Sequence, residues 1–165
     1  MSEWRKRAVE GVGEGDTFVV TRTFGKELAR TFGEMTGDFN PVHFDQEFAR
    51  LKGFGDNICH GLLAGSLVTL IGGQIAWLAT KMEFSFLKPV PFGEKITCTL
   101  KVMSVDKRRF ARAEARITNT EGVELVRCTL EGYLPSEKDR ARLAEMHKSG
   151  DPTNKLHGRG KYDDQ

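Results

Sequence analysis

Residues 36–45, TGDFNPVHFD, place a carboxylate and an imidazole five positions apart, on Asp38 and His43. Pro41 has no N–H and pushes the preceding residue out of the α region, so a helix must end before it. We therefore expect both side chains on an irregular loop, where they can share one water molecule. One group would accept the proton of that water while the other orients it. The spacing indicates general acid–base chemistry.

A structural interpretation of the same stretch stays open. Gly-Asp and Asn-Pro are common turn sequences, so Asp38 can cap the following turn and His43 can be a half-buried polar residue. Asn40 is expected to shape the loop, not to react.

A second stretch, CHGLLAGSL at residues 59–67, places His60 and Gly61 at the start of an apolar segment. The first N–H groups of a helix have no internal partner, and the helix dipole adds partial positive charge there. The Gly61 N–H, with no Cβ beside it, can approach a substrate oxygen closely. An acid–base pair and an oxyanion donor together suit the addition of water to a double bond conjugated with a carbonyl.

A metal site is the competing hypothesis for these residues. His43, Asp45 and His60 form a formal set of two histidines and one carboxylate, as in non-haem iron oxygenases. Those ligands normally come from strands of an all-β fold, whereas here the donors border helices. We therefore predict no metal and no cofactor.

Length and charge restrict the class of protein. A chain of 165 residues fits one domain, and 25 basic against 23 acidic side chains give no overall field for nucleic acid. Three cysteines cannot all pair within the chain, and two lie in strand-like runs, which favours reduced core thiols. The N-terminal residues lack the apolar run of a secretory signal, so we expect a cytoplasmic location.

The uncharged segment from Gly61 to Thr80 is long enough to span a membrane. Glycines, hydroxyl residues and Gln74 dilute it, and no basic flank supports insertion. We predict a helix over 61–80, buried on all sides in a soluble domain, with no membrane partner.

Hydrophobic periodicity predicts the other elements. Helical spacing covers Phe24 to Thr36, with Gly37 as C-cap, and a short helix is expected near 45–51. Residues 17–24 are a short strand candidate. Alternation of apolar and polar residues predicts antiparallel strands at 81–90, 94–105, 110–118 and 123–134. The apolar helix must cover their buried face, which gives an α+β architecture of a curved sheet around one long helix. We divide the chain into a flexible lead-in (1–16), this domain (17–135), and a charged helix over about 136–147 with a disordered tail (136–165).

The two motifs resemble those of the MaoC-like, R-specific enoyl-CoA hydratases. FGEMTGDFNPVHFD is followed by HGLLAGSL at a matching separation, and FSFLKPVPFGEKI at residues 84–96 resembles that family's strand and Lys-Pro-Val turn. The resemblance covers about residues 17–134. Gln46 departs from the family pattern, in which a small residue follows the last Asp, and this bears on pocket shape.

The resemblance implies a hot dog fold and a site for trans-2-enoyl-CoA, hydrated reversibly to (R)-3-hydroxyacyl-CoA. Asp38 and His43 would activate the water, and the Gly61 amide would polarise the thioester carbonyl. His60 would be either a supporting residue or a helix cap. Phe44 and Leu62 are candidates to line the acyl pocket, and ordinary core packing is the alternative for both. A homodimer, which completes the sheet and groove in single-domain members, is expected.

The phosphates of coenzyme A need cations, and the hairpin turn with Lys107, Arg108 and Arg109 is one candidate; a solvated turn is the alternative.

Two other functions stay open. A hot dog thioesterase usually has a carboxylate on or near its long helix, and 61–80 has none. A noncatalytic acyl-CoA-binding module would tolerate Asp38→Asn, unlike a hydratase.

Overall fold

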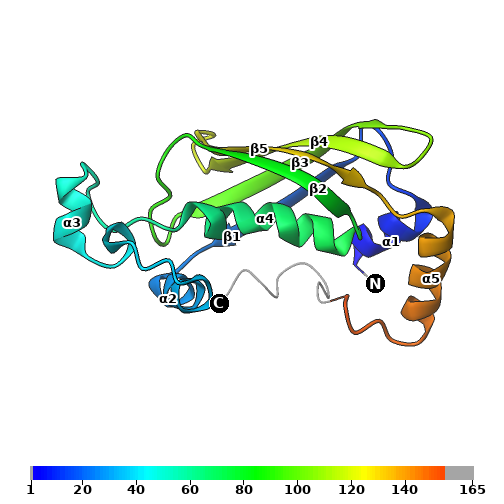
Figure 1. Ribbon diagram of the computed structural model, residues 1–165, viewed down its shortest axis with the longest axis horizontal. Coiled ribbons are helices and arrows are strands. Elements are labelled where there is room, and N and C mark those ends of the chain that lie inside the picture. Colours follow the sequence, from blue (N-terminus) through cyan, green and yellow to red (C-terminus); the bar gives the residue numbers. More distant parts are fainter. Residues whose placement is uncertain (1, 155–165) are drawn as a thin grey trace.

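A five-stranded antiparallel sheet, in the order β1-β3-β4-β5-β2, curves over one long helix in the computed structural model, which describes residues 2–154 (Figure 1). The strands are β1 (Thr17–Thr23), β2 (Leu78–Phe86), β3 (Lys95–Val105), β4 (Phe110–Asn119) and β5 (Glu124–Tyr133). The helices are α1 (Glu3–Glu10), α2 (Lys26–Thr36), α3 (Gln46–Leu51), α4 (Gly61–Gln74) and α5 (Glu137–Lys148), with a 3₁₀ turn, η1, at Pro41–His43. This is the predicted α+β architecture.

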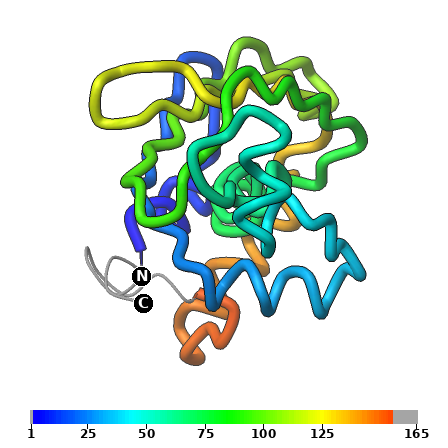
Figure 2. The backbone as a smooth tube through the Cα atoms, turned by 90° about the vertical axis from the view of Figure 1, so that its left-hand side faces the viewer, coloured from blue at the N-terminus to red at the C-terminus, as the bar shows by residue number. Residues whose placement is uncertain are grey.

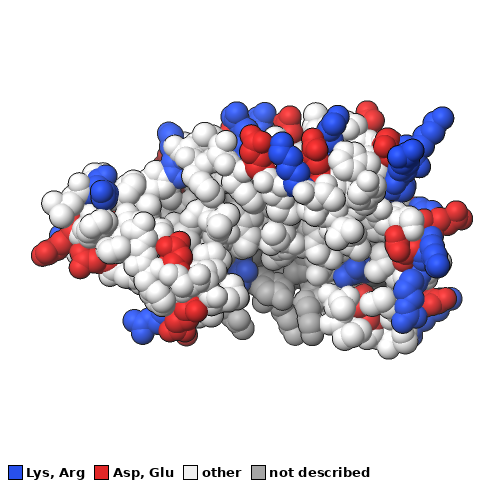
Figure 3. Space-filling model, in the orientation of Figure 1, with Lys and Arg blue, Asp and Glu red and all other residues white. Residues whose placement is uncertain are grey.

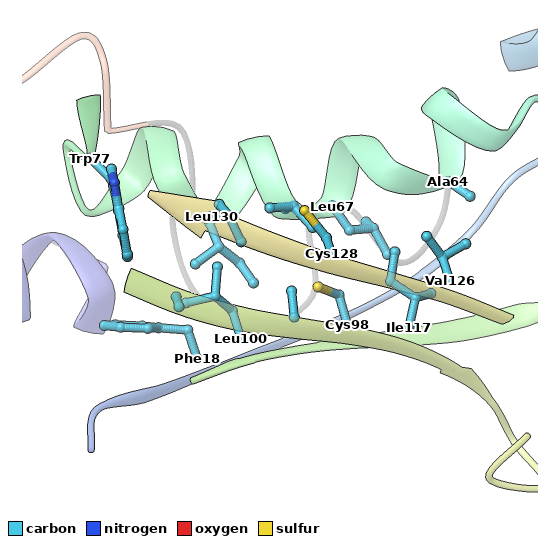
Figure 4. Packing of buried hydrophobic residues seen from close by; sticks show 14 of the residues in the cluster. Phe18, Ala64, Leu67, Trp77, Cys98, Leu100, Ile117, Val126, Cys128 and Leu130 are labelled. Carbon is cyan, nitrogen blue, oxygen red and sulfur yellow. The ribbon is translucent and has the colours of Figure 1, made fainter. Parts of the chain in front are cut away.

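The core lies between α4 and the concave face of the sheet. Alternate side chains of β3, β4 and β5 point to this face, because successive residues of a strand point to opposite sides. Figure 4 shows Leu67 of α4 above Leu100, Cys128 and Leu130 from the strands. Alanines at alternate positions of β4 leave room for the helix to approach the sheet.

The helix prediction over 61–80 was wrong at its C-terminal end. α4 ends at Gln74, and the last residues of the predicted helix, from Leu78 on, belong to β2. The turn between them contains Ala76 at φ 53°, a left-handed conformation that ends a helix. The helix is also not buried on all sides, since Leu62 is 57% exposed. Among the described residues, no helix has the length and apolar character needed to cross a membrane.

The N-terminal residues are folded, which differs from the predicted loose lead-in. Ser2 caps α1, and the helix lies beside α5 at the end of the sheet away from α3 (Figure 1). Arg5 lies 3.5 Å from Asp151 and donates to Thr153 Oγ1 over 3.2 Å, with both charged side chains buried. We call Arg5, Asp151 and Thr153 the terminal clamp. It draws part of the predicted disordered tail into the structure, and positions 155–165 lie outside the described residues.

The predicted charged helix is confirmed as α5, which begins with a capping box between Ser136 and Asp139. The cysteines also behave as predicted, because Cys59, Cys98 and Cys128 are buried free thiols. Burial raises the pKa of Cys98 to about 12, so this thiol stays protonated in the core.

Candidate active site

The loop between α2 and α3 is irregular, as its sequence predicts. α2 ends at Gly37, which takes the left-handed conformation at φ 76°. Asn40 Oδ1 accepts a 3.2 Å hydrogen bond from the N–H of Val42 and so starts η1, with Pro41 in its first position. Asp38 Oδ1 accepts from the Asn40 N–H over 3.3 Å. Asn40 therefore shapes the loop, and the exposed Asp38 carboxylate stands at its surface.

The loop brings Asp38 and His43 together with His60, which precedes α4. Potential ligand atoms of the three side chains all lie within 4.8 Å of one another. The imidazoles of His43 and His60 stack, with ring centroids 3.8 Å apart and an interplanar angle of 28°. The Phe44 ring stands edge-on to both, at 6.3 Å and 5.7 Å. Phe44 thus helps to enclose the histidine pair and is partly exposed.

His43 is arranged to act as a base. Its Nδ1 lies 2.8 Å from the carbonyl oxygen of Ile58, which can only accept, so we assign the proton to Nδ1. Nε2 then carries the lone pair. Burial lowers the pKa of His43 below 6.5 and the nearby His60 adds to this, while the Ile58 hydrogen bond and the charge of Asp38 act in the opposite direction. The imidazole is therefore neutral and able to accept a proton near pH 7.

His60 holds the loop in place. It is 1% exposed, and its Nε2 donates a 3.0 Å hydrogen bond to the backbone carbonyl of Asp38. Its side chain makes no capping hydrogen bond to α4, so of the two predicted roles the geometry fits the supporting one. Its Nδ1 is buried with no partner in the described part of the chain, which is a cost in stability.

The N-terminus of α4 adjoins this cluster. The side chain of the N-cap residue, His60, makes no capping hydrogen bond. The first N–H groups of a helix, here including that of Gly61, have no partner within the helix. A Cβ at Gly61 would lie 2.7 Å from the Phe86 ring, and one at Gly65 would lie 2.9 Å from the Phe84 ring. Glycine is thus needed at positions 61 and 65, where the stacked rings of Phe84 and Phe86 from β2 pack against α4.

A groove of about 500 Å³ opens at this point, and we call it the Asp38 groove. Its walls come from the loop, the start of α4, and the end of β2 with the segment after it. Figure 2 looks at the molecule from this end, with the segment containing α3 in front of α4. The lining residues are Asp38, His43, Phe54, Ile58, Cys59, Gly61, Leu62, Phe86, Leu87, Lys88, Pro89, Val90 and Val126. The predicted residues Asp38, His43, Gly61 and Leu62 therefore share one concave, largely apolar surface.

The predicted cations of the β3–β4 turn lie elsewhere. This turn carries Lys107, Arg108 and Arg109. It lies at the opposite end of the sheet from α3, near α1 and α5 (Figure 1). Arg109 donates to the carbonyls of Val12 over 2.6 Å and Pro135 over 3.3 Å, so its guanidinium links the terminal segments.

Lys88 is the cation that the sequence reasoning missed. It follows β2 and lines the Asp38 groove. Lys88 is the lysine of the Lys-Pro-Val turn, directly after the alternating apolar residues of β2. This position could have indicated a cation near the site.

The structure changes the ligand set of the competing metal hypothesis. The Asp45 carboxylate accepts a 2.7 Å hydrogen bond from the Phe48 N–H and caps α3, so it is turned to another role. Asp38, His43 and His60 remain as a group whose potential ligand atoms lie close together. The absence of a metal stays a prediction.

A curved antiparallel sheet around one long helix is the architecture of the hot dog fold. Among solved structures, the (R)-hydratase from A. caviae involved in PHA biosynthesis matches with a TM-score of 0.71 and 27% identity, over 76% of this chain and 99% of that one. A MaoC-like dehydratase from Rhodospirillum rubrum, at a TM-score of 0.63 and 18% identity over 77% of this chain and 97% of that one, shows the same fold.

The family model described as MaoC like domain matches residues 8–124. The chain therefore belongs to the MaoC-like family, as predicted.

Two curated relatives carry named activities. The mitochondrial 3-hydroxyacyl-[acyl-carrier-protein] dehydratase of Arabidopsis thaliana is 42% identical over 84 residues, which are 50% of this chain and 51% of that protein. The match thus spans about half of the plant protein. The (R)-specific enoyl-CoA hydratase of Aeromonas caviae is 31% identical over 90 residues, 52% of this chain and 67% of that one. The names of both describe hydration or dehydration of acyl thioesters, on two different carriers.

Proposed function

We propose that the protein reversibly hydrates trans-2-enoyl thioesters to (R)-3-hydroxyacyl thioesters. The observation that carries this proposal is the position of His43, whose Nδ1 faces the Ile58 carbonyl, beside Asp38 and the start of α4 in one groove. Support for the (R) configuration comes from the family members named above, because the groove by itself does not select one face of the double bond.

The reaction can be written with the residues of this chain alone. A water bound between Asp38 and His43 gives a proton to His43 Nε2, and its oxygen bonds to C3 of the substrate. The electron pair of the C2–C3 double bond moves toward the thioester oxygen, where the Gly61 N–H and the dipole of α4 stabilise the charge. The proton then passes from His43 to C2. No electron is gained or lost, so the step requires no cofactor.

Coenzyme A is the carrier that we propose first, with Lys88 at the edge of the Asp38 groove as a partner for its phosphates. An acyl carrier protein is the second candidate, because the plant relative is named for that carrier. Both carriers present a phosphopantetheine arm. We keep a cytoplasmic location as a prediction, alongside a plant relative that is named mitochondrial.

We further propose that the protein is a homodimer joined through β2. This strand is at one edge of the sheet, so one side of its backbone has no partner strand among residues 2–154. The face that carries β2 and α4 has few charged side chains at its centre (Figure 3). Leu62, Leu78, Phe86 and Leu87 are large apolar residues exposed in this region. A second copy would cover them and would extend the sheet.

The test is to mix the purified protein with crotonyl-CoA and follow the absorbance of the conjugated enoyl thioester and the release of free thiol. Loss of absorbance without thiol release, abolished by Asp38→Asn, is the expected result. Released thiol would instead identify a thioesterase. Binding of the thioester without turnover, unchanged in Asp38→Asn, would identify a noncatalytic module. Repeating the assay with crotonyl-acyl carrier protein distinguishes the carriers.

A further inference from the structure

A short segment before α4, residues 57–59, joins the loop between α2 and α3 to the segment that follows β2. We call it the linking segment. On one side, the Cys59 N–H donates a 2.8 Å hydrogen bond to the carbonyl of Val90. On the other side, the Ile58 N–H donates to the carbonyl of Val42 over 3.4 Å. The two surrounding segments are therefore held through the same few backbone groups.

His43 is bound to the linking segment in the reverse direction. It follows Val42 directly in the chain, and its Nδ1 donates a 2.8 Å hydrogen bond to the carbonyl of Ile58. The N–H and the carbonyl of Ile58 thus contact two consecutive residues of the loop. A shift of Val42 relative to Ile58 would therefore move the acceptor that keeps the proton on His43 Nδ1.

Asn57 supplies a second donor to the Val42 carbonyl. Its Nδ2 lies 3.3 Å from this oxygen, which has two lone pairs and can accept from Asn57 and Ile58 together. The Ile58 bond is long, so by itself it holds the carbonyl weakly. Asn57 and Val42 are both buried, and a hydrogen bond away from water is electrostatically stronger than one at the surface.

We propose that Asn57 is a positioning residue for His43. Its amide holds the Val42 carbonyl on the linking segment, which fixes the Ile58 carbonyl beside His43 Nδ1 and leaves Nε2 to accept the proton of the water. The proposal rests on the proposed hydratase function. Asn57 is not among the residues that line the Asp38 groove, so it acts through His43 and not on the substrate.

Loss of the Asn57 amide should change the protonated nitrogen of His43. A neutral imidazole carries one ring proton, and the hydrogen bond at one nitrogen decides which nitrogen keeps it. If the Ile58 carbonyl moves away from Nδ1, the proton can transfer to Nε2. His43 can then no longer take a proton from the bound water at that atom. The expected defect is in the chemical step, with substrate binding preserved.

The test compares the wild-type protein with Asn57→Leu, which has a similar size and no donor. With crotonyl-CoA, kcat should fall about 10²-fold, the cost of a displacement of about 1 Å at a reacting group, and KM should stay nearly unchanged. NMR of nitrogen-labelled histidine rings, recorded well above pH 6.5, should show part of the His43 population protonated at Nε2. The His43 signals are identified by their absence in His43→Phe.

Asn119→Leu is the matched control. Asn119 Oδ1 accepts a 2.9 Å hydrogen bond from the Val123 N–H, and its Nδ2 donates to Glu94 over 3.0 Å, so this asparagine also holds a turn. It does not line the Asp38 groove. This variant should keep the wild-type kcat and the wild-type His43 spectrum, even where its stability is lower. If Asn57→Leu does not fold, Asn57→Ala, which is smaller and also lacks the donor, takes its place.

Three results decide against these ideas, and they are distinguishable. A wild-type kcat in the Asn57 variant, or a His43 ring that keeps its proton on Nδ1, would overturn the proposal and leave Asn57 as a packing residue. The same changes in Asn119→Leu would indicate general destabilisation and would also overturn it. Wild-type protein inactive on any enoyl thioester would instead refute the hydratase function, while the NMR spectra would still report whether Asn57 sets the His43 proton.

Discussion

Replacing His60 with phenylalanine is expected to slow catalysis strongly and to lower the free energy of unfolding by at most about 3 kcal/mol. The substitution removes the 3.0 Å hydrogen bond to the Asp38 carbonyl, worth about 1 kcal/mol, and also the buried Nδ1 without a partner, whose removal recovers about 1–3 kcal/mol. The larger ring costs about 1–3 kcal/mol in packing. These contributions partly cancel, so we expect a net effect between a gain of about 1 kcal/mol and a loss of about 3 kcal/mol.

The same substitution releases the loop that carries Asp38. A displacement of about 1 Å at a reacting group costs on the order of 10²-fold in rate. Because His60 is buried behind His43 and is not among the residues lining the Asp38 groove, kcat should fall more than KM rises. Steady-state kinetics with crotonyl-CoA and urea unfolding of the same preparations measure both quantities.

His60→Gln is the matched control for this experiment. The glutamine amide nitrogen can take the position of Nε2 and donate to the Asp38 carbonyl, so this variant should retain more activity than His60→Phe. The reasoning is refuted if His60→Phe keeps the wild-type kcat, or if the glutamine variant is no better than phenylalanine.

Four further predictions concern the site and its supports. Because burial lowers the pKa of His43, the rate kcat/KM should fall with acidification only below pH 6.5, in a pH profile with crotonyl-CoA. The unfolded chain binds this proton more readily, so the contribution of His43 to stability falls as the pH drops from 6.5 to the lowered pKa. Gly61→Ala should lower kcat about 10²-fold, because the new Cβ would lie 2.7 Å from the Phe86 ring and displace the oxyanion donor. Arg109→Ala should lower the free energy of unfolding by about 1–3 kcal/mol in urea titrations, with KM for crotonyl-CoA unchanged.

Each of these has a result that would contradict it. If kcat/KM already falls with acidification above pH 6.5, His43 is not a buried neutral base. Gly73→Ala is the control for Gly61, since a Cβ there meets nothing within 4 Å, and equal losses in both would indicate a general effect on α4. A raised KM with unchanged stability in Arg109→Ala would instead support the original prediction that Arg109 binds coenzyme A.

The strands and the reactive loop could be predicted because their signals are local. Alternation along β3, β4 and β5 reports which face is buried, and Gly37 and Pro41 fix where α2 must end. These signals need no knowledge of distant residues. They therefore identified the sheet, its covering helix and the loop of Asp38 and His43 from sequence alone.

The errors occurred where distant contacts decide the structure. A run of uncharged residues does not show that α4 ends at Gln74, because an interior helix and an edge strand can have similar composition. The polar sequence of α1 indicates a loose segment unless the contact between Arg5 and Asp151 is known. The role of Arg109 depends on two carbonyls far away in the sequence, and a charged turn gives no sign of them.

The terminal clamp has a consequence for the order of folding. The hydrogen bond from Arg5 to Thr153 joins residues 148 positions apart, so almost the whole domain must be synthesised before it can form. Until then the guanidinium of Arg5 has no buried carboxylate beside it, and burying it alone is strongly unfavourable. The sheet and α4 can form earlier from residues that are closer in the sequence. We therefore expect α1 to dock last, although it precedes the sheet and α4 in the sequence.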